Sequence, residues 1–132
     1  MTHTETLELC VRDYECDLQG IVNNSVYLNY LEHARHTMLL NCNISFANLH
    51  NQGIDLVVNR IEIDYKHSLT SGDRFVVKSS MHREGHIRMV FEQEILKLPD
   101  NKLAVKARVI GVGLRNGKPI KVNDIEGFES LQ

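Results

Sequence analysis

The chain has 132 residues, 42% of them apolar and 24% charged, which predicts one globular domain over residues 1–132 with its own hydrophobic core. The formal net charge of −2, without a long basic run, argues against a nucleic-acid partner, because such binding depends on neutralising phosphates. No apolar run approaches the roughly 20 residues of a membrane span, and the N-terminus lacks the basic and apolar regions of a secretory signal, so we expect neither.

The first predicted element is a strand over residues 6–14, where apolar and polar side chains alternate. A turn that contains Asp17 and Gly20 follows it. From about Ser25 the apolar residues recur every three or four positions, which predicts an apolar helix of about four turns, roughly 22 Å long. Its candidate caps are Asn23, Asn24 and Ser25 at the start and Asn41 and Asn43 at the end.

Strand patterns fill most of the chain after this helix. Residues 44–53 predict a short helix or loop, and residues 124–132 predict a final helical turn. A slip in the alternation at Val57 and Val58 indicates a β-bulge. The four strands predicted in this part of the chain lie at residues 54–65, 74–83, 87–98 and 103–114.

The turns between these four strands are short, which forces neighbouring strands to pair antiparallel. A five-stranded antiparallel sheet must bury one face, and the single long apolar helix is available to cover it, so we predict an α+β fold. Long strands with uncovered edges favour pairing with a second copy of the chain. We therefore expect a homodimer or a homotetramer.

The three cysteines, Cys10, Cys16 and Cys42, form neither a disulfide framework nor a zinc ribbon. Such a set is typical of a reducing compartment, so we expect a cytoplasmic protein with structural cysteines. The histidines show no zinc spacing: His33 and His36 lie one helical turn apart without an evident third ligand. We predict no metal and no cofactor.

Residues 17–35 contain a spaced motif. It reads D-x-x-G-x-V-x-N-x-x-Y-L and then E-x-A-R, and it comprises Asp17, Gly20, Val22, Asn24, Tyr27, Leu28, Glu32, Ala34 and Arg35. This motif resembles that of the hotdog-fold acyl-CoA thioesterases of the 4-hydroxybenzoyl-CoA thioesterase-like family. The resemblance implies a five-stranded antiparallel sheet wrapped around one long central helix, and active sites at subunit interfaces.

Many members of that family carry a histidine at the position of Asn24. The pair Asn23 and Asn24 is similar to the pair in the 4-hydroxybenzoyl-CoA enzyme itself and in plant acyl-ACP thioesterases. The choice between a coenzyme A and an acyl-carrier-protein (ACP) substrate therefore stays open.

Thioester hydrolysis needs a polarised carbonyl and an attacking group. Asp17 is the candidate nucleophile or general base. The backbone N–H groups of Val22, Asn23 and Asn24, at a helix N-terminus, are the candidate oxyanion site. The side chain of Asn24 could position water or substrate. The alternative is that Asp17 is only a turn residue and Asn24 only an N-cap.

Three further residues are candidates for the site, and for each a purely structural role is at least as well supported by the sequence. Glu32 is a candidate catalytic acid that orients Asn24 or a water, or else a solvent-facing or Arg35-paired glutamate. Tyr14 and Tyr27 are candidate substrate contacts, or else packing residues.

Lys66 and Arg88 are candidate contacts for coenzyme A phosphates, or else solvated surface charges. The sequence thus predicts an acyl-CoA thioesterase, with Asp17 as its central residue. The alternatives are an acyl-ACP thioesterase, a hotdog dehydratase and a non-catalytic protein that binds acyl-CoA.

Overall fold

The computed structural model describes residues 3–132. Its long elements are five strands and one helix, and the shorter elements are one strand, one helix and two 3-10 turns (η). In chain order they are β1 (His3–Cys10), η1 (Asp13–Glu15), α1 (Asn24–Asn41), α2 (Phe46–Asn51), β2 (Ile54–Tyr65), β3 (Arg74–Glu84), β4 (Arg88–Lys97), β5 (Lys102–Arg115), β6 (Lys118–Ile120) and η2 (Val122–Asp124).

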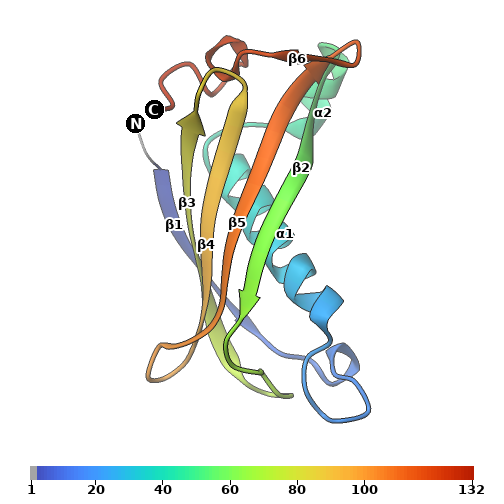
Figure 1. Ribbon diagram of the computed structural model, residues 1–132, viewed down its shortest axis with the longest axis vertical. Coiled ribbons are helices and arrows are strands. Elements are labelled where there is room, and N and C mark those ends of the chain that lie inside the picture. Colours follow the sequence, from blue (N-terminus) through green and yellow to red (C-terminus); the bar gives the residue numbers. More distant parts are fainter. Residues whose placement is uncertain (1–2) are drawn as a thin grey trace.

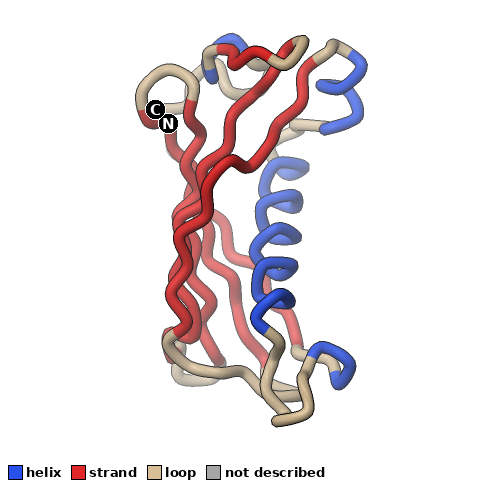
Figure 2. The backbone as a smooth tube through the Cα atoms, turned by 45° about the vertical axis from the view of Figure 1, so that its right-hand side comes forward, coloured by secondary structure: helices blue, strands red, loops and turns tan. Residues whose placement is uncertain are grey.

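The strands form one antiparallel sheet in the order β1-β3-β4-β5-β2, and α1 lies along its concave face (Figures 1 and 2). This confirms the predicted hotdog arrangement of a sheet around one long helix. The short strand β6 was not predicted, and it pairs with the end of β5. The turn between them contains Asn116 and Gly117, both with positive φ, as a tight hairpin turn requires.

Helix α1 begins and ends at asparagines. The side chain of Asn23 caps its start by accepting the Ser25 N–H at 3.3 Å. Its 18 residues correspond to roughly 27 Å, about one turn more than the predicted length, although the helix ends at Asn41, one of the two predicted end positions. The chain then reverses through Asn43, which has a φ of +62°.

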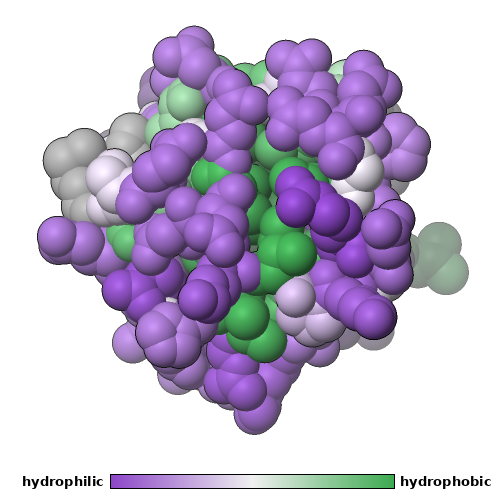
Figure 3. All heavy atoms as spheres, turned by 90° about the horizontal axis from the view of Figure 1, so that it is seen from above, coloured by the Kyte–Doolittle hydropathy of each residue, from purple (hydrophilic) through white to green (hydrophobic). Residues whose placement is uncertain are grey.

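The core between helix and sheet has two halves. One half packs the start of α1 on the end of the sheet where β3 and β5 begin, and it includes Leu31, Phe75 and Ile95. The other packs the end of α1 under the C-terminal segment, whose Phe128 is 1% exposed. Seen from that end of the molecule, polar side chains surround a strip of apolar ones (Figure 3).

Strand β2 forms one edge of the sheet. Its pairing with β5 shifts register between Val58 and Arg60, as the slip in the sequence pattern predicted. No helix of residues 3–132 is long and apolar enough to cross a membrane. The three cysteines are free thiols, and the cytoplasmic location stays a prediction.

Candidate active site

The loop between η1 and α1 is a tight turn held by its own backbone. Cys16 and Val22 form an isolated antiparallel bridge, and the Asp17 N–H donates to the Ile21 carbonyl over 2.9 Å. The Gly20 N–H donates to the Asp17 carbonyl over 3.0 Å, and its φ of +81° is one that glycine adopts without strain. The tip of the loop, Asp17 included, is therefore exposed.

One oxygen of the Asp17 carboxylate is fixed by this loop and the other is not. Oδ1 accepts the N–H of Gln19 at 2.8 Å and lies 3.4 Å from the nitrogen of Ile21, as in an Asx turn. Oδ2 has no hydrogen-bond partner within residues 3–132. Asp17 is thus a turn residue that also keeps a carboxylate oxygen available for chemistry.

The start of α1 leaves fewer free amides than the sequence suggested. We expected the N–H groups of Val22, Asn23 and Asn24 to hold an oxyanion. In the structure Val22 donates to the Leu69 carbonyl over 2.9 Å and Asn23 donates to the Glu15 carbonyl over 3.0 Å, which corrects the expectation for these two amides. The Asn24 N–H has no partner in the described part of the chain, because a helix leaves its first amides unbonded.

Glu15, which the sequence did not single out, is a buried acid at the base of this loop. It is 7% exposed and accepts hydrogen bonds from Arg12 and Tyr30. Burial raises the pKa of the Glu15 carboxyl, but these hydrogen bonds and the Arg12 charge outweigh burial and leave that pKa below its usual value. Its one signal in the sequence was its position two residues before Asp17.

The aromatic residues near the helix start differ in exposure. Tyr27 is 3% exposed, and its hydroxyl accepts the Leu69 N–H at 2.9 Å, so it is a core residue of the protomer. Tyr65, which the sequence did not single out, is 46% exposed and packs against Tyr27 with ring centroids 5.6 Å apart. Its hydroxyl lies 3.5 Å from the Asn24 carbonyl. Tyr14 is 77% exposed and lies at the surface.

A groove of about 330 Å³ lies between the second half of α1 and the start of β2. Glu32 stands at this groove with its side chain 55% exposed, and it lies 3.7 Å from His36. It forms no ion pair with Arg35, which donates instead to Gln93 at 3.1 Å. The apolar walls of the groove include Leu39, Phe46, Leu56, Val57, Met89 and Phe91.

The two cations expected at the substrate lie at opposite ends of the protomer. Lys66 follows β2 at the end that carries the Asp17 loop, whereas Arg88 begins β4 at the other end (Figure 1). Arg88 shares a row of the sheet with Val112 and Val57. Within one protomer, the structure therefore does not bring Arg88 to Asp17.

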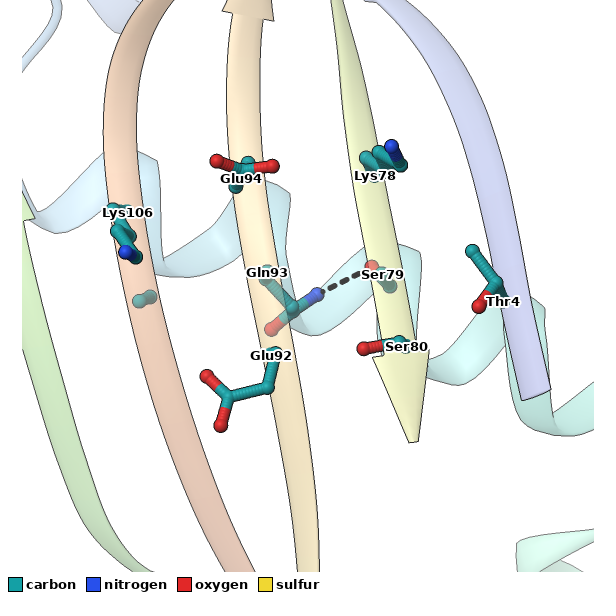
Figure 4. A pocket seen from close by; sticks show the side chains of 9 residues that line it. Thr4, Lys78, Ser79, Ser80, Glu92, Gln93, Glu94 and Lys106 are labelled. Carbon is teal, nitrogen blue, oxygen red and sulfur yellow. Dashed lines mark hydrogen bonds between the residues drawn. The ribbon is translucent and has the colours of Figure 1, made fainter. Parts of the chain in front are cut away.

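A separate hollow of about 390 Å³ lies on the outer face of the sheet, away from this site. Figure 4 shows Lys78, Glu94 and Lys106 on three neighbouring strands, with α1 behind the sheet. These residues are direct cross-strand partners, so opposite charges alternate along the row. We assign this hollow to surface charge pairing rather than to chemistry.

A family model described as the Thioesterase-like superfamily matches residues 11–126. Two chloroplastic acyl-acyl carrier protein thioesterases of Arabidopsis thaliana, ATL3 and ATL2, are 36% and 39% identical to this chain over 123 and 110 residues. The matches cover 92% and 83% of this chain but 65% and 58% of those proteins, so the chain spans less than two thirds of their length. A solved 1,4-dihydroxy-2-naphthoyl-CoA thioesterase from Synechocystis shares the fold, with a TM-score of 0.90 at 21% identity over 97% of this chain and 94% of that one.

Proposed function

This chain belongs to the thioesterase-like superfamily, and we propose that it hydrolyses an acyl thioester, with Asp17 as nucleophile or general base. The observation that carries the proposal is the Asp17 carboxylate, which stands on the loop that leads into α1 with Oδ2 free. The names of the two Arabidopsis relatives support a thioester as the substrate.

Two routes use the same residues. In the nucleophilic route, Oδ2 of Asp17 attacks the thioester carbon, the carbon–sulfur bond breaks, and the thiolate leaves and takes a proton from solvent. Water then hydrolyses the mixed anhydride, which releases the acid and restores Asp17. In the general-base route, Asp17 takes a proton from a water molecule, positioned by the Asn24 side chain, as that water attacks the carbonyl. The carbon–sulfur bond of the tetrahedral intermediate then breaks, and the leaving thiolate takes the proton back from Asp17.

Of the three amides of residues 22–24, the Asn24 N–H is the one left to bind the developing oxyanion in either route. The Asn24 N–H lies at the N-terminus of α1, where the helix dipole is also favourable to negative charge. A donor of this kind typically contributes about 3 kcal/mol to transition-state stabilisation. The Asn24 amide therefore takes the role that three amides shared in the expectation from sequence.

We propose that a second copy of the chain completes the site by pairing along β2. On this edge strand, Val57, Val58, Ile61 and Tyr65 are 38%, 47%, 39% and 46% exposed. In an antiparallel pair of identical strands, the end of one lies beside the start of the other. The Asp17 loop, at the Tyr65 end of β2, then faces the groove of the second copy.

This arrangement gives the remaining candidates a place. The groove supplies apolar walls for an acyl chain, with Glu32 at its opening. Arg88 shares the Val57 row, so pairing of two β2 strands carries it toward the Asp17 loop of the other copy. Lys66 already lies at that end, and the two cations are placed to bind phosphate groups of the carrier.

Acyl-CoA is the proposed substrate, and acyl-ACP is the second candidate because the Arabidopsis relatives are named for it. The test is thiol release from the same acyl chains presented on both carriers. A higher kcat/KM on acyl-CoA supports the first candidate, and the reverse supports the second. Tight binding of acyl-CoA without turnover on either carrier would indicate a non-catalytic binding protein. Full activity in a monomer, measured by light scattering, would refute the shared site.

A further inference from the structure

Glu15 has no role in the hydrolysis proposed above, although it is buried two residues before Asp17 in the chain. A buried carboxylate is unfavourable unless hydrogen bonds and an opposite charge compensate for its lost hydration. Both of its oxygens are engaged. Oε1 accepts the Arg12 N–H and the Tyr30 hydroxyl, each at 2.8 Å, and Oε2 accepts the Arg12 guanidinium at 2.9 Å.

The donors come from two different parts of the fold. Arg12 lies between β1 and η1, and its side chain is 62% exposed. Tyr30 lies in the second turn of α1, is 4% exposed, and packs on Phe75 with ring centroids 4.7 Å apart. The Glu15 carboxylate therefore joins the start of the Asp17 loop to the body of α1.

The backbone of Glu15 holds the other end of the same loop. Its carbonyl accepts the Asn23 N–H at 3.0 Å, next to the bridge between Cys16 and Val22. The hydrogen bonds of Asp17, by contrast, stay within the loop. Both stems of the loop thus meet at Glu15, and the second stem also pairs with the turn before β3 through the bridge between Ile21 and Thr70.

We infer that Glu15 is a positioning residue, whose carboxylate, held by Arg12 and Tyr30, sets where the Asp17 carboxylate stands relative to the Asn24 amide. The inference rests on the proposed thioester hydrolysis. Glu15 acts on both groups, because its side chain fixes the stem next to Asp17 and its carbonyl fixes the residue before Asn24. A displacement of about 1 Å between reacting groups can lower a rate about 100-fold. Glu15 therefore acts on kcat more than on KM.

The test compares two variants of this contact. Glu15→Gln keeps the size of the side chain but removes the charge and cannot accept all three donors; we expect kcat to fall about 100-fold with KM nearly unchanged. Tyr30→Phe removes one hydrogen bond and keeps the aromatic packing, and we expect kcat to fall about 10-fold. The double variant should be no slower than Glu15→Gln, because both changes act through one contact.

Glu8→Gln is the matched control. Glu8 and Glu15 both line a hollow of about 690 Å³ between β1 and α1. Unlike Glu15, Glu8 is exposed, and it forms an ion pair with Arg74 at 2.8 Å. This variant should keep the wild-type kcat. Hydrogen exchange gives a second readout that does not need activity: the amides of Asp17 and Ile21 should exchange faster in Glu15→Gln and in Tyr30→Phe than in the control.

The outcomes separate the two proposals. Wild-type protein that hydrolyses no acyl thioester refutes the proposed function and the role of Glu15 with it. Wild-type turnover with unchanged kcat in both variants refutes the role of Glu15 alone. A loss of activity that matches the unfolded fraction seen by circular dichroism, or that adds up in the double variant, would show a structural role only and also overturn the inference.

Discussion

Two charged side chains are buried at helix α1, and they differ in whether a hydrogen-bond partner carries the opposite charge. Beneath its first half, the Glu15 anion meets a cation and a hydroxyl. Beneath its second half, the Arg35 cation is 8% exposed, and its hydrogen bond goes to the neutral side chain of Gln93. Burial lowers the pKa of Arg35, whereas hydrogen bonding holds the pKa of Glu15 down.

This difference indicates different roles for the Glu15 cluster (with Arg12 and Tyr30) and the Arg35 cluster (with Gln93). Gln93 also donates to the Leu31 carbonyl at 3.0 Å and to Ser79 at 2.9 Å, so the second cluster joins helix to sheet. The first cluster joins the helix to an exposed loop with a free carboxylate oxygen. A buried charge next to a loop can control geometry at the surface, while one between two packed layers mainly stabilises the packing.

The largest expected effect on activity comes from replacing Asp17, the residue that the first cluster holds in position. If this replacement left activity unchanged, the contrast between the two clusters would no longer hold. Asp17→Asn keeps the turn acceptor Oδ1 but removes the nucleophile or base. We expect kcat to fall by about 1000-fold or more, with little change in Tm because Asp17 is exposed. Thiol release and thermal melting measure the two effects. Asp100→Asn, at an exposed position in the turn between β4 and β5, is the control, and full activity in Asp17→Asn would refute the assignment of Asp17.

The second cluster should show the reverse pattern. Gln93→Leu leaves the buried guanidinium of Arg35 without its acceptor, and we expect a loss of about 3 kcal/mol in the free energy of unfolding. At this chain length the Tm should fall by about 10 °C, while kcat per folded molecule stays near wild type. Denaturant titration measures the loss. Glu94→Gln, on the outer face of the same strand, should change neither quantity.

The smallest effect is the dependence of stability on acid pH. The pKa of Glu15 lies below its ordinary value of 4.5 in the folded state, so its contribution to stability is present above pH 4.5 and is lost as the pH falls through the folded pKa. The difference in unfolding free energy between wild type and Glu15→Gln should therefore shrink between pH 7 and pH 3. A difference that stays constant over this range would show that the charge of Glu15 is unimportant.

The fold could be predicted from the sequence because its signals are local. Alternation marks each long strand, and the change of period at Ser25 marks the helix. Asparagines marked both ends of α1, and only the length stated for the helix, about four turns, was too short.

The site could be predicted only in part, for the same reason. Asp17 and Asn24 belong to a spaced motif, so the sequence singled them out as candidates, and their catalytic roles stay predictions. The partners that occupy the Val22 and Asn23 amides and that bury Glu15 come from other elements. Nothing in the spacing of residues 11–35 indicates those contacts.

The strand order also has a kinetic consequence. β3, β4 and β5 follow one another and pair as hairpins, whereas β1 pairs with β3 across the whole of α1, α2 and β2. Contacts between distant segments form slowly, because closing a long loop costs conformational entropy before the pairing compensates for it. We expect the hairpins to form early and β1 to dock late. The loop that carries Asp17 would then be among the last parts of the chain to become ordered during folding.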